Sequence, residues 1–195
     1  RWTNVPFIMH IRPRPPDNIL ARWQARQILK TMDHLVFITE NEQEWLARLA
    51  GEATGTVIYN ARPDTGRGPE AHPSIPLDGR FKIASLSNFS WPRGVDRLVD
   101  IAVELEARGN KDVLFVLAGD MHLQKNLPGR LGELGLKGAT LADYANECGV
   151  VDSFLFLGHV PDPENVLFSC DVLVKPTRED NPWGRDIIES LHFGR

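Results

Sequence analysis

Short apolar runs alternate with segments of helical periodicity along almost the whole chain. Residues 113–117 are continuously apolar, which is typical of a parallel strand covered on both faces. Residues 94–107 instead place apolar side chains on one face of a helix, and Gly109 provides its C-terminal stop. Strands separated by helices indicate parallel pairing through right-handed crossovers, so the pattern predicts an α/β fold.

The same pattern gives the order of the expected elements. Strands are predicted at 5–11, 34–38, 56–59, 81–86, 113–117, 154–157 and 172–174. Helices are predicted from the cap Asp17–Asn18 to residue 31 and at 41–49, 94–107, 141–147, 164–168 and 185–191, with 123–136 as a long connection.

The composition changes in the middle of the chain. Residues 60–79 are rich in proline, glycine and charge, which is typical of a linker. We therefore expect one domain at 1–63, a linker at 64–79 and a second domain at 80–195.

Charge and cysteine content narrow the function classes. The net charge of −4 disfavours nucleic acid as a main partner, because phosphate binding needs clustered Lys and Arg. Cys148 and Cys170 have no CxxC spacing or histidine cluster near them, so no metal site is predicted, and two isolated cysteines fit a reducing compartment.

The sequence has no apolar run of bilayer length and does not open with a signal peptide. Because it starts without Met and stops where another strand is expected, we expect a fragment of a longer protein.

In parallel sheets, ligands bind beyond the carboxyl ends of the strands. The loops after Leu86, Leu117, Leu157 and Val174 are therefore the expected binding loops. The last of them is acidic, contains Gly184 and opens a helix, whose backbone N–H groups near Gly184 and Arg185 can hold an anion such as a diphosphate. A carboxylate five residues after Gly184, at Glu189, can accept two ribose hydroxyls.

The stretch from Asp171 to Leu191 resembles the signature of glycosyltransferase family 4, a family of retaining enzymes with the GT-B fold of two facing Rossmann-like domains. The resemblance implies that Glu189 holds the nucleotide ribose. The first Glu of the family motif contacts the donor sugar, and its position is Asn181 here. Glu179 and Asp180 come just before it, so the resemblance leaves the sugar-contacting group open within 179–181.

A second stretch, Ser87 to Asp96, resembles the family's phosphate loop. Arg93 takes the place of the family's Lys, which neutralises the donor diphosphate, and its planar fork suits phosphate. The family's Arg is replaced by Ser87 or Asn88, depending on the alignment, and loss of that cation should weaken stabilisation of the leaving group.

Three further segments complete the resemblance. Ala118-Gly119-Asp120 is similar to a glycine-rich turn of the family, and Leu157-Gly158-His159-Val160 is similar to a turn whose backbone contacts the base edge. The segment ending in His10 resembles an acceptor-domain strand whose His faces the donor sugar. Residues 57–61 resemble the sequence before the interdomain linker, which makes 1–63 part of the acceptor-side domain and 80–195 the donor-binding domain.

The resemblance implies a retaining glycosyltransferase that moves a sugar from a nucleotide-diphosphate sugar to a glycan, lipid or small-molecule acceptor. It implies no metal and no cofactor, since the nucleotide sugar is a substrate. We expect a cytoplasmic protein, with peripheral membrane contact through an N-terminal region outside this sequence, and an inactive fragment. The alternatives are a GT-B nucleotide-sugar epimerase and a non-catalytic nucleotide-sugar-binding subunit. A phosphorylase lacks a convincing pyridoxal lysine motif here, and a dinucleotide oxidoreductase lacks GxGxxG after the strands at 81 and 113.

Overall fold

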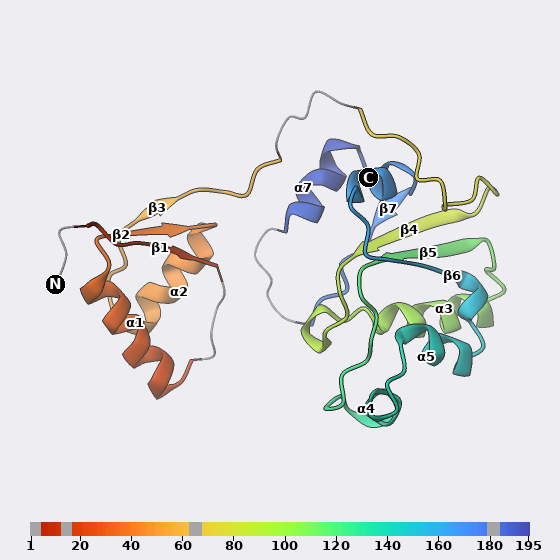
Figure 1. Cartoon of the computed structure of the whole chain (residues 1–195), viewed down its shortest axis with the longest axis horizontal. Coiled ribbons are helices and arrows are strands. Elements are labelled where there is room, and N and C mark those ends of the chain that lie inside the picture. The colour runs from red at the N-terminus through yellow and green to blue at the C-terminus, as the bar shows by residue number, and fades with distance from the viewer. Residues whose placement is uncertain (1–4, 13–16, 63–67, 179–183) are drawn as a thin grey trace. The chain divides into compact units, whose positions relative to one another are not determined.

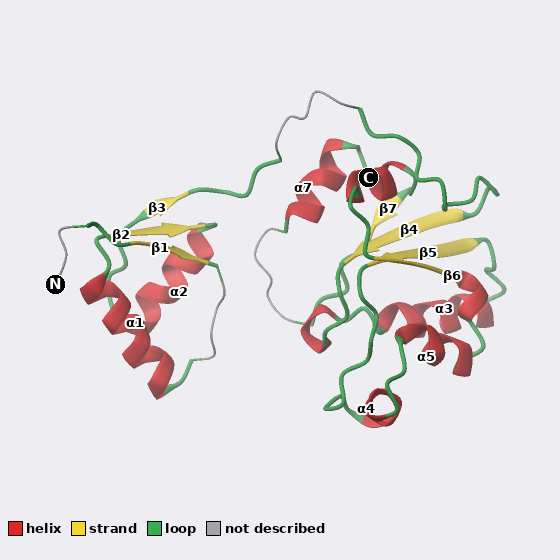
Figure 2. Ribbon diagram, viewed as in Figure 1, coloured by secondary structure: helices red, strands yellow, loops and turns green. Residues whose placement is uncertain are grey.

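The computed structural model describes residues 5–12, 17–62, 68–178 and 184–195. The chain divides into two compact units: Arg1–Arg62 with Asn181–Ile188, and Pro63–Asp180 with Glu189–Arg195. In each unit parallel strands alternate with helices (Figures 1 and 2), which confirms the predicted α/β class.

The first unit is built on a three-stranded parallel sheet in the order β1-β2-β3. Its strands are β1 (Ile8–Ile11), β2 (His34–Phe37) and β3 (Thr56–Val57), and its helices are α1 (Ile19–Thr31) and α2 (Glu40–Ala50). The side chain of Asn18 accepts a hydrogen bond from the Ala21 amide at 2.8 Å, so Asn18 is the N-cap of α1 as expected. Phe37 is fully buried in the core between sheet and helices.

The prediction of a buried strand over 5–11 was wrong in length and in burial. Pro6 has no N–H to donate, and β1 begins only at Ile8. Ile8 is 66% exposed whereas Ile11 is buried. The reason is that α1 and α2 cover the same face of this sheet (Figure 1), as two right-handed crossovers in one direction require, so only alternate side chains of β1 enter the core.

The second unit contains a four-stranded parallel sheet in the order β6-β5-β4-β7. Its strands are β4 (Phe81–Leu86), β5 (Val113–Ala118), β6 (Phe154–Gly158) and β7 (Val172–Leu173). The chain moves from β4 outward to β6 and then returns to the other side of β4. The strand order therefore reverses between β4 and β7, and loops that leave the carboxyl ends of these strands diverge to form a ligand crevice in folds of this kind.

Both faces of this sheet are covered, which confirms the interpretation of the apolar run at 113–117. Phe115 and Leu117 face the helices α3 (Arg97–Ala107), α4 (Gly129–Leu136) and α5 (Leu141–Glu147). Leu114 and Val116 face α6 (Pro163–Phe168) on the opposite side. A strand of period two that is buried on both faces has no polar position, so its sequence is apolar throughout.

Two helices of the second unit also differ from the prediction. The helix expected from residue 94 begins at Arg97, because Gly94 adopts φ 67° and ends a short 3₁₀ turn, η1 (Trp91–Arg93). The expected long connection contains the helix α4. This helix was not predicted because Gly129, Gly132 and Gly135 lower the helical propensity of the segment. Two of these glycines are needed for close packing: a Cβ on Gly132 would lie 2.0 Å from the Leu127 carbonyl oxygen, and one on Gly135 would lie 2.3 Å from that of Gln124.

The described part of the predicted linker packs on the second unit. The Glu70 amide donates to the Asn165 side chain at 2.9 Å, and the His72 amide donates to the Ser169 hydroxyl at 2.7 Å. Ile75 is buried in the core on the α6 face. The last helix is α7 (Arg185–His192), and none of the described helices is both long and apolar enough to span a membrane.

Candidate functional site

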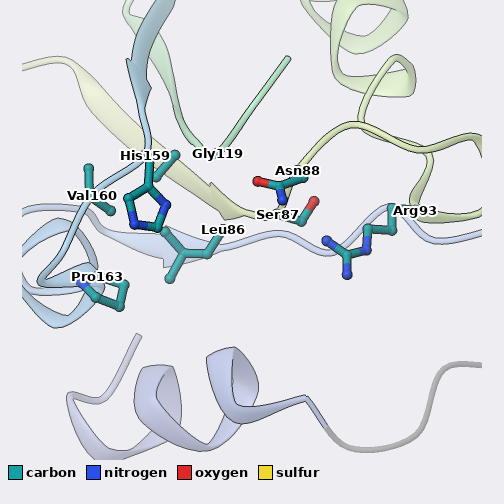
Figure 3. Close-up of a pocket in the computed structure, with 9 residues that line it drawn as sticks. Leu86, Ser87, Asn88, Arg93, Gly119, His159, Val160 and Pro163 are labelled. Carbon is teal, nitrogen blue, oxygen red and sulfur yellow. The ribbon is translucent and has the colours of Figure 1, made fainter. Parts of the chain in front are cut away.

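A pocket of about 260 Å³ opens at the carboxyl edge of the sheet in the second unit. In Figure 3 the polar residues Ser87, Asn88 and Arg93 lie on one side, and His159, Val160 and Pro163 lie on another. The complete lining is Leu86, Ser87, Asn88, Arg93, Ala118, Gly119, His159, Val160 and Pro163. Six residues that the sequence pointed to, namely Ser87, Asn88, Arg93, Gly119, His159 and Val160, are thus brought together.

The loops after β4 and β5 form one side of this pocket. They continue the strand pairing: the Ser87 amide donates to the Ala118 carbonyl at 3.0 Å, and the Phe89 amide donates to the Asp120 carbonyl at 2.6 Å. The Asn88 side-chain oxygen accepts from the Asp120 amide at 2.9 Å. With that oxygen engaged, the amide nitrogen is the group by which Asn88 can donate to a ligand.

Gly119 allows these loops to approach each other. It adopts φ 138°, and a Cβ at this position would lie 2.6 Å from the backbone carbonyl carbon and oxygen of Ser87. Its amide also donates to the Gly158 carbonyl at 2.7 Å, which ties the loop after β5 to the end of β6. A residue without a side chain is therefore required at the centre of the pocket rim.

Arg93 brings a positive charge to the pocket. It is the last residue of η1, and its side chain is exposed. The Arg93 amide donates to the Ser90 carbonyl at 3.0 Å, and the Gly94 amide donates to the carbonyls of Ser90 and Trp91. The sequence predicted a long helix directly after Arg93, but the structure places Arg93 in a tight turn four residues before the first residue of α3.

His159, Val160 and Pro163 come from the turn between β6 and α6. Gly158 adopts φ 66° and redirects the chain at the end of the strand, so that the next two residues reach the pocket. His159 is exposed and Val160 is half-buried. Pro163 occupies the first turn of α6, where its missing N–H removes no hydrogen bond.

Other predicted residues lie elsewhere. Glu189 is in α7 and is only 7% exposed, and it is not among the residues that line this pocket. Gly184 and Arg185, at the start of α7, are grouped with the first unit. His10 lies in β1, exposed and in register with Val36, and the strand continues one residue beyond it. Glu179, Asp180 and Asn181 lie outside the described residues.

An exposed carboxylate, that of Asp120, lies next to the pocket residue Gly119. Asp120 follows Gly119, and its Oδ1 lies 2.5 Å from Nδ1 of His122. The hydrogen bond from the His122 side chain, with a second from the His122 amide, lowers the pKa of Asp120 below its ordinary value. In the part of the chain that the structure describes, no three His, Cys, Asp or Glu side chains gather as a metal site would need.

The pocket combines the Arg93 guanidinium, the Ser87 hydroxyl, the Asn88 amide and the His159 imidazole with apolar side chains. Such a set suits a ligand that has an anionic end and a flat or apolar end. Leu86, Ala118 and Pro163 also line it and were not among the predicted site residues. Leu86 and Ala118 are the last residues of their strands, so the carboxyl-edge rule was the signal for them, and Pro163 could be found as a helix-start proline.

Comparisons with known proteins agree with this architecture. The family model "Glycosyl transferases group 1" matches residues 69–195. None of the curated proteins matches the sequence.

Solved structures resemble almost the whole chain. HepE from Anabaena, in complex with UDP and glucose, superposes with a TM-score of 0.75 at 19% identity over 97% of this chain and 51% of its own. A TarM variant from S. aureus, in complex with fondaparinux, α-GlcNAc-glycerol and UDP, gives a TM-score of 0.67 at 13% identity over 96% and 35%. A glycosyltransferase from Rickettsia africae gives 0.64 at 16% identity over 98% and 50%. The fold is therefore that of GT-B proteins, and the chain spans about half the length of HepE.

Proposed function

Since the chain belongs to the family of glycosyl transferases group 1, we propose that the whole protein transfers a sugar from a nucleotide-diphosphate sugar to an acceptor hydroxyl. The observation that carries the proposal is the pocket at the carboxyl edge, which gathers Arg93, Ser87 and Asn88 beside His159 and Val160. In this reaction the bond between the sugar C1 and the diphosphate oxygen breaks, the acceptor oxygen bonds to C1, and a nucleoside diphosphate and a proton leave.

The diphosphate is assigned to the polar side of the pocket. Negative charge grows on the departing phosphate oxygens, and a fixed guanidinium with neutral donors stabilises that charge. Arg93 supplies the cation, and the Ser87 hydroxyl and Asn88 amide supply donors. We propose that no metal is needed, because these groups and the backbone N–H groups near Gly184 and Arg185 neutralise the diphosphate.

From the resemblance to family 4 we propose three further roles. Glu189 holds the ribose, the segment 179–181 orients the sugar, and His10 faces the donor sugar from the acceptor-side domain. Retention of the anomeric configuration also belongs to this proposal. A cytoplasmic location and a glycan, lipid or small-molecule acceptor remain predictions.

Nucleotide binding tests the proposal directly. HepE binds UDP, so UDP is the first probe, with GDP, ADP and dTDP as further probes. We expect titration calorimetry of the full chain to show that Arg93→Gln and Glu189→Ala each raise the dissociation constant of the preferred diphosphate about tenfold or more, the equivalent of one charge-assisted hydrogen bond. Arg108→Gln is the matched control, because Arg108 pairs with Glu104 outside the pocket.

Two binding results would contradict the assignment of this pocket to a nucleotide. If none of the four diphosphates binds the full chain, or if Arg93→Gln and Arg108→Gln bind equally well, the pocket is not a nucleotide site. Release of nucleoside diphosphate from nucleotide sugars then separates turnover from binding. The alternative of a non-catalytic binder is favoured by the neutral Asn88, which stands with Ser87 where the family has a cation, and it predicts binding without release.

A further inference from the structure

An arginine outside the pocket joins the two loops at the point where the strand order reverses. Arg178 follows β7, and its guanidinium donates to both carboxylate oxygens of Asp96, at 2.8 and 2.5 Å. It also donates to the Trp91 carbonyl at 2.9 Å and lies over the Trp91 ring, 3.6 Å from its centre. The side chain of Arg178 is 18% exposed and that of Asp96 is 5% exposed, so the pair is largely shielded from water.

The backbone of the same two loops interlocks. The Arg178 amide donates to the Pro92 carbonyl at 2.8 Å, and the Thr177 hydroxyl donates to the same oxygen at 3.1 Å. Gly94 passes so close that a Cβ on it would lie 2.1 Å from the Pro176 carbonyl oxygen. The turn of residues 91–96 is therefore fixed by the segment 176–178 rather than by its own short helix alone.

These contacts lie on both sides of Arg93, the residue that brings positive charge to the pocket. Pro92 and Gly94, both held by the loop after β7, are the chain neighbours of Arg93. Arg93 itself is exposed, so the direction of its backbone sets where its guanidinium can reach. We propose that Arg178 is a positioning residue that holds the turn 91–96 and so directs the Arg93 guanidinium into the pocket, an inference that rests on the proposed function.

The chemistry of the contact requires arginine. A guanidinium can bond both oxygens of Asp96 in its plane and stack on the Trp91 ring, whereas the ammonium of lysine is a point charge without a fork. Negative charge is also concentrated here: burial and the neighbouring Asp96 raise the pKa of Asp100. Removing the Arg178 charge altogether would leave Asp96 buried without its cation and would destabilise the unit, so lysine is the informative substitution.

A double-mutant cycle on UDP affinity tests whether Arg178 acts by positioning Arg93 or by stabilising the whole unit. The full chain is titrated with UDP in four forms: native, Arg178→Lys, Arg93→Gln and the double variant. We expect Arg178→Lys to raise the dissociation constant about tenfold in the native background and less than about twofold in the Arg93→Gln background, because the two residues act through one contact. Uridine, which has no phosphate, should bind native and Arg178→Lys proteins equally.

Arg130→Lys is the matched control, since Arg130 forms an equally forked pair with Glu147 away from the pocket. Melting temperatures confirm that each variant is folded. If Arg178→Lys does not fold, Asp96→Asn takes its place in the cycle. Equal losses of UDP affinity in both backgrounds, or no loss, would overturn the positioning role. If native protein fails to bind UDP, the proposed function fails for this nucleotide, and hydrogen exchange of the backbone amides of residues 93–95 decides the inference. Faster exchange in Arg178→Lys supports it, and unchanged exchange overturns it.

Discussion

Gly119 offers a sharp test of how the pocket is built. The change is Gly119→Ala, a single methyl group at a backbone with φ 138°. The new Cβ would lie 2.6 Å from the carbonyl carbon and oxygen of Ser87 and 2.8 Å from the amide nitrogen of Asn88. Backbone atoms cannot rotate away as a side chain can, so the loop after β4 must move.

The cost has two parts. An L-residue in a sparsely populated backbone region costs about 1–3 kcal/mol. Forcing an extra methyl group into a closely packed site costs about 1–3 kcal/mol more. The sum is a loss of about 2–6 kcal/mol in the stability of the second unit, where Gly119 also hydrogen-bonds to Gly158.

Gly149→Ala is the matched control. Gly149 also has a positive φ, of 76°, but a Cβ there would meet no atom within 4 Å. It should cost only the left-handed backbone term, about 1–2 kcal/mol. Gly149 precedes the amino end of β6, at the opposite edge from the pocket, so its substitution should leave UDP affinity unchanged.

Native-state hydrogen exchange on peptides from β4 and β5 measures the opening free energy of the second unit in the full chain. We expect Gly119→Ala to lower it by more than Gly149→Ala, and to weaken UDP binding because Ser87 and Asn88 are displaced. Equal loss of opening free energy in the two variants would refute the argument that close approach of the loops requires a glycine at position 119.

Three further predictions concern the core and the stability of the second unit. Burial raises the pKa of the Cys170 thiol to about 12, so at pH 8 a disulfide reagent should label it only after unfolding; labelling of folded protein at the rate of a free thiol would contradict its position in the core. Thr140 and Asp143 form a capping box at the start of α5, so Thr140→Ala should cost about 1 kcal/mol of unfolding free energy, measured by urea titration. The hydrogen bonds from the Thr140 amide and hydroxyl lower the pKa of Asp143. The contribution of Asp143 to stability is therefore complete above its ordinary pKa of 3.8 and is lost as the pH falls through its lower pKa in the folded protein. A stability difference between native protein and Asp143→Asn that persists unchanged at more acidic pH would contradict this.

The sequence by itself determined the order of the elements and the edge at which ligands are expected. Periodicity is a local property: a strand buried on both faces, such as 113–118, must be apolar throughout, and the helix predicted at 141–147 has the same bounds in the structure. The carboxyl-edge rule then pointed to the loops after β4, β5 and β6, and their residues share one pocket. Local signals failed where glycines serve packing, since α4 has the composition of a loop but uses its glycines to approach residues 124–127.

Only the tertiary structure decided which distant residues meet. Asp96 and Arg178 are 82 positions apart, and nothing near either one indicates a partner. Their pairing depends on β7 returning to lie beside β4, with Ala84 in register with Leu173. The same strand order places Pro176 against Gly94, and the helix that the sequence predicted from Gly94 begins only at Arg97. A local pattern records how each segment buries its own side chains, whereas the environment of a loop is set by the strands that flank it in space.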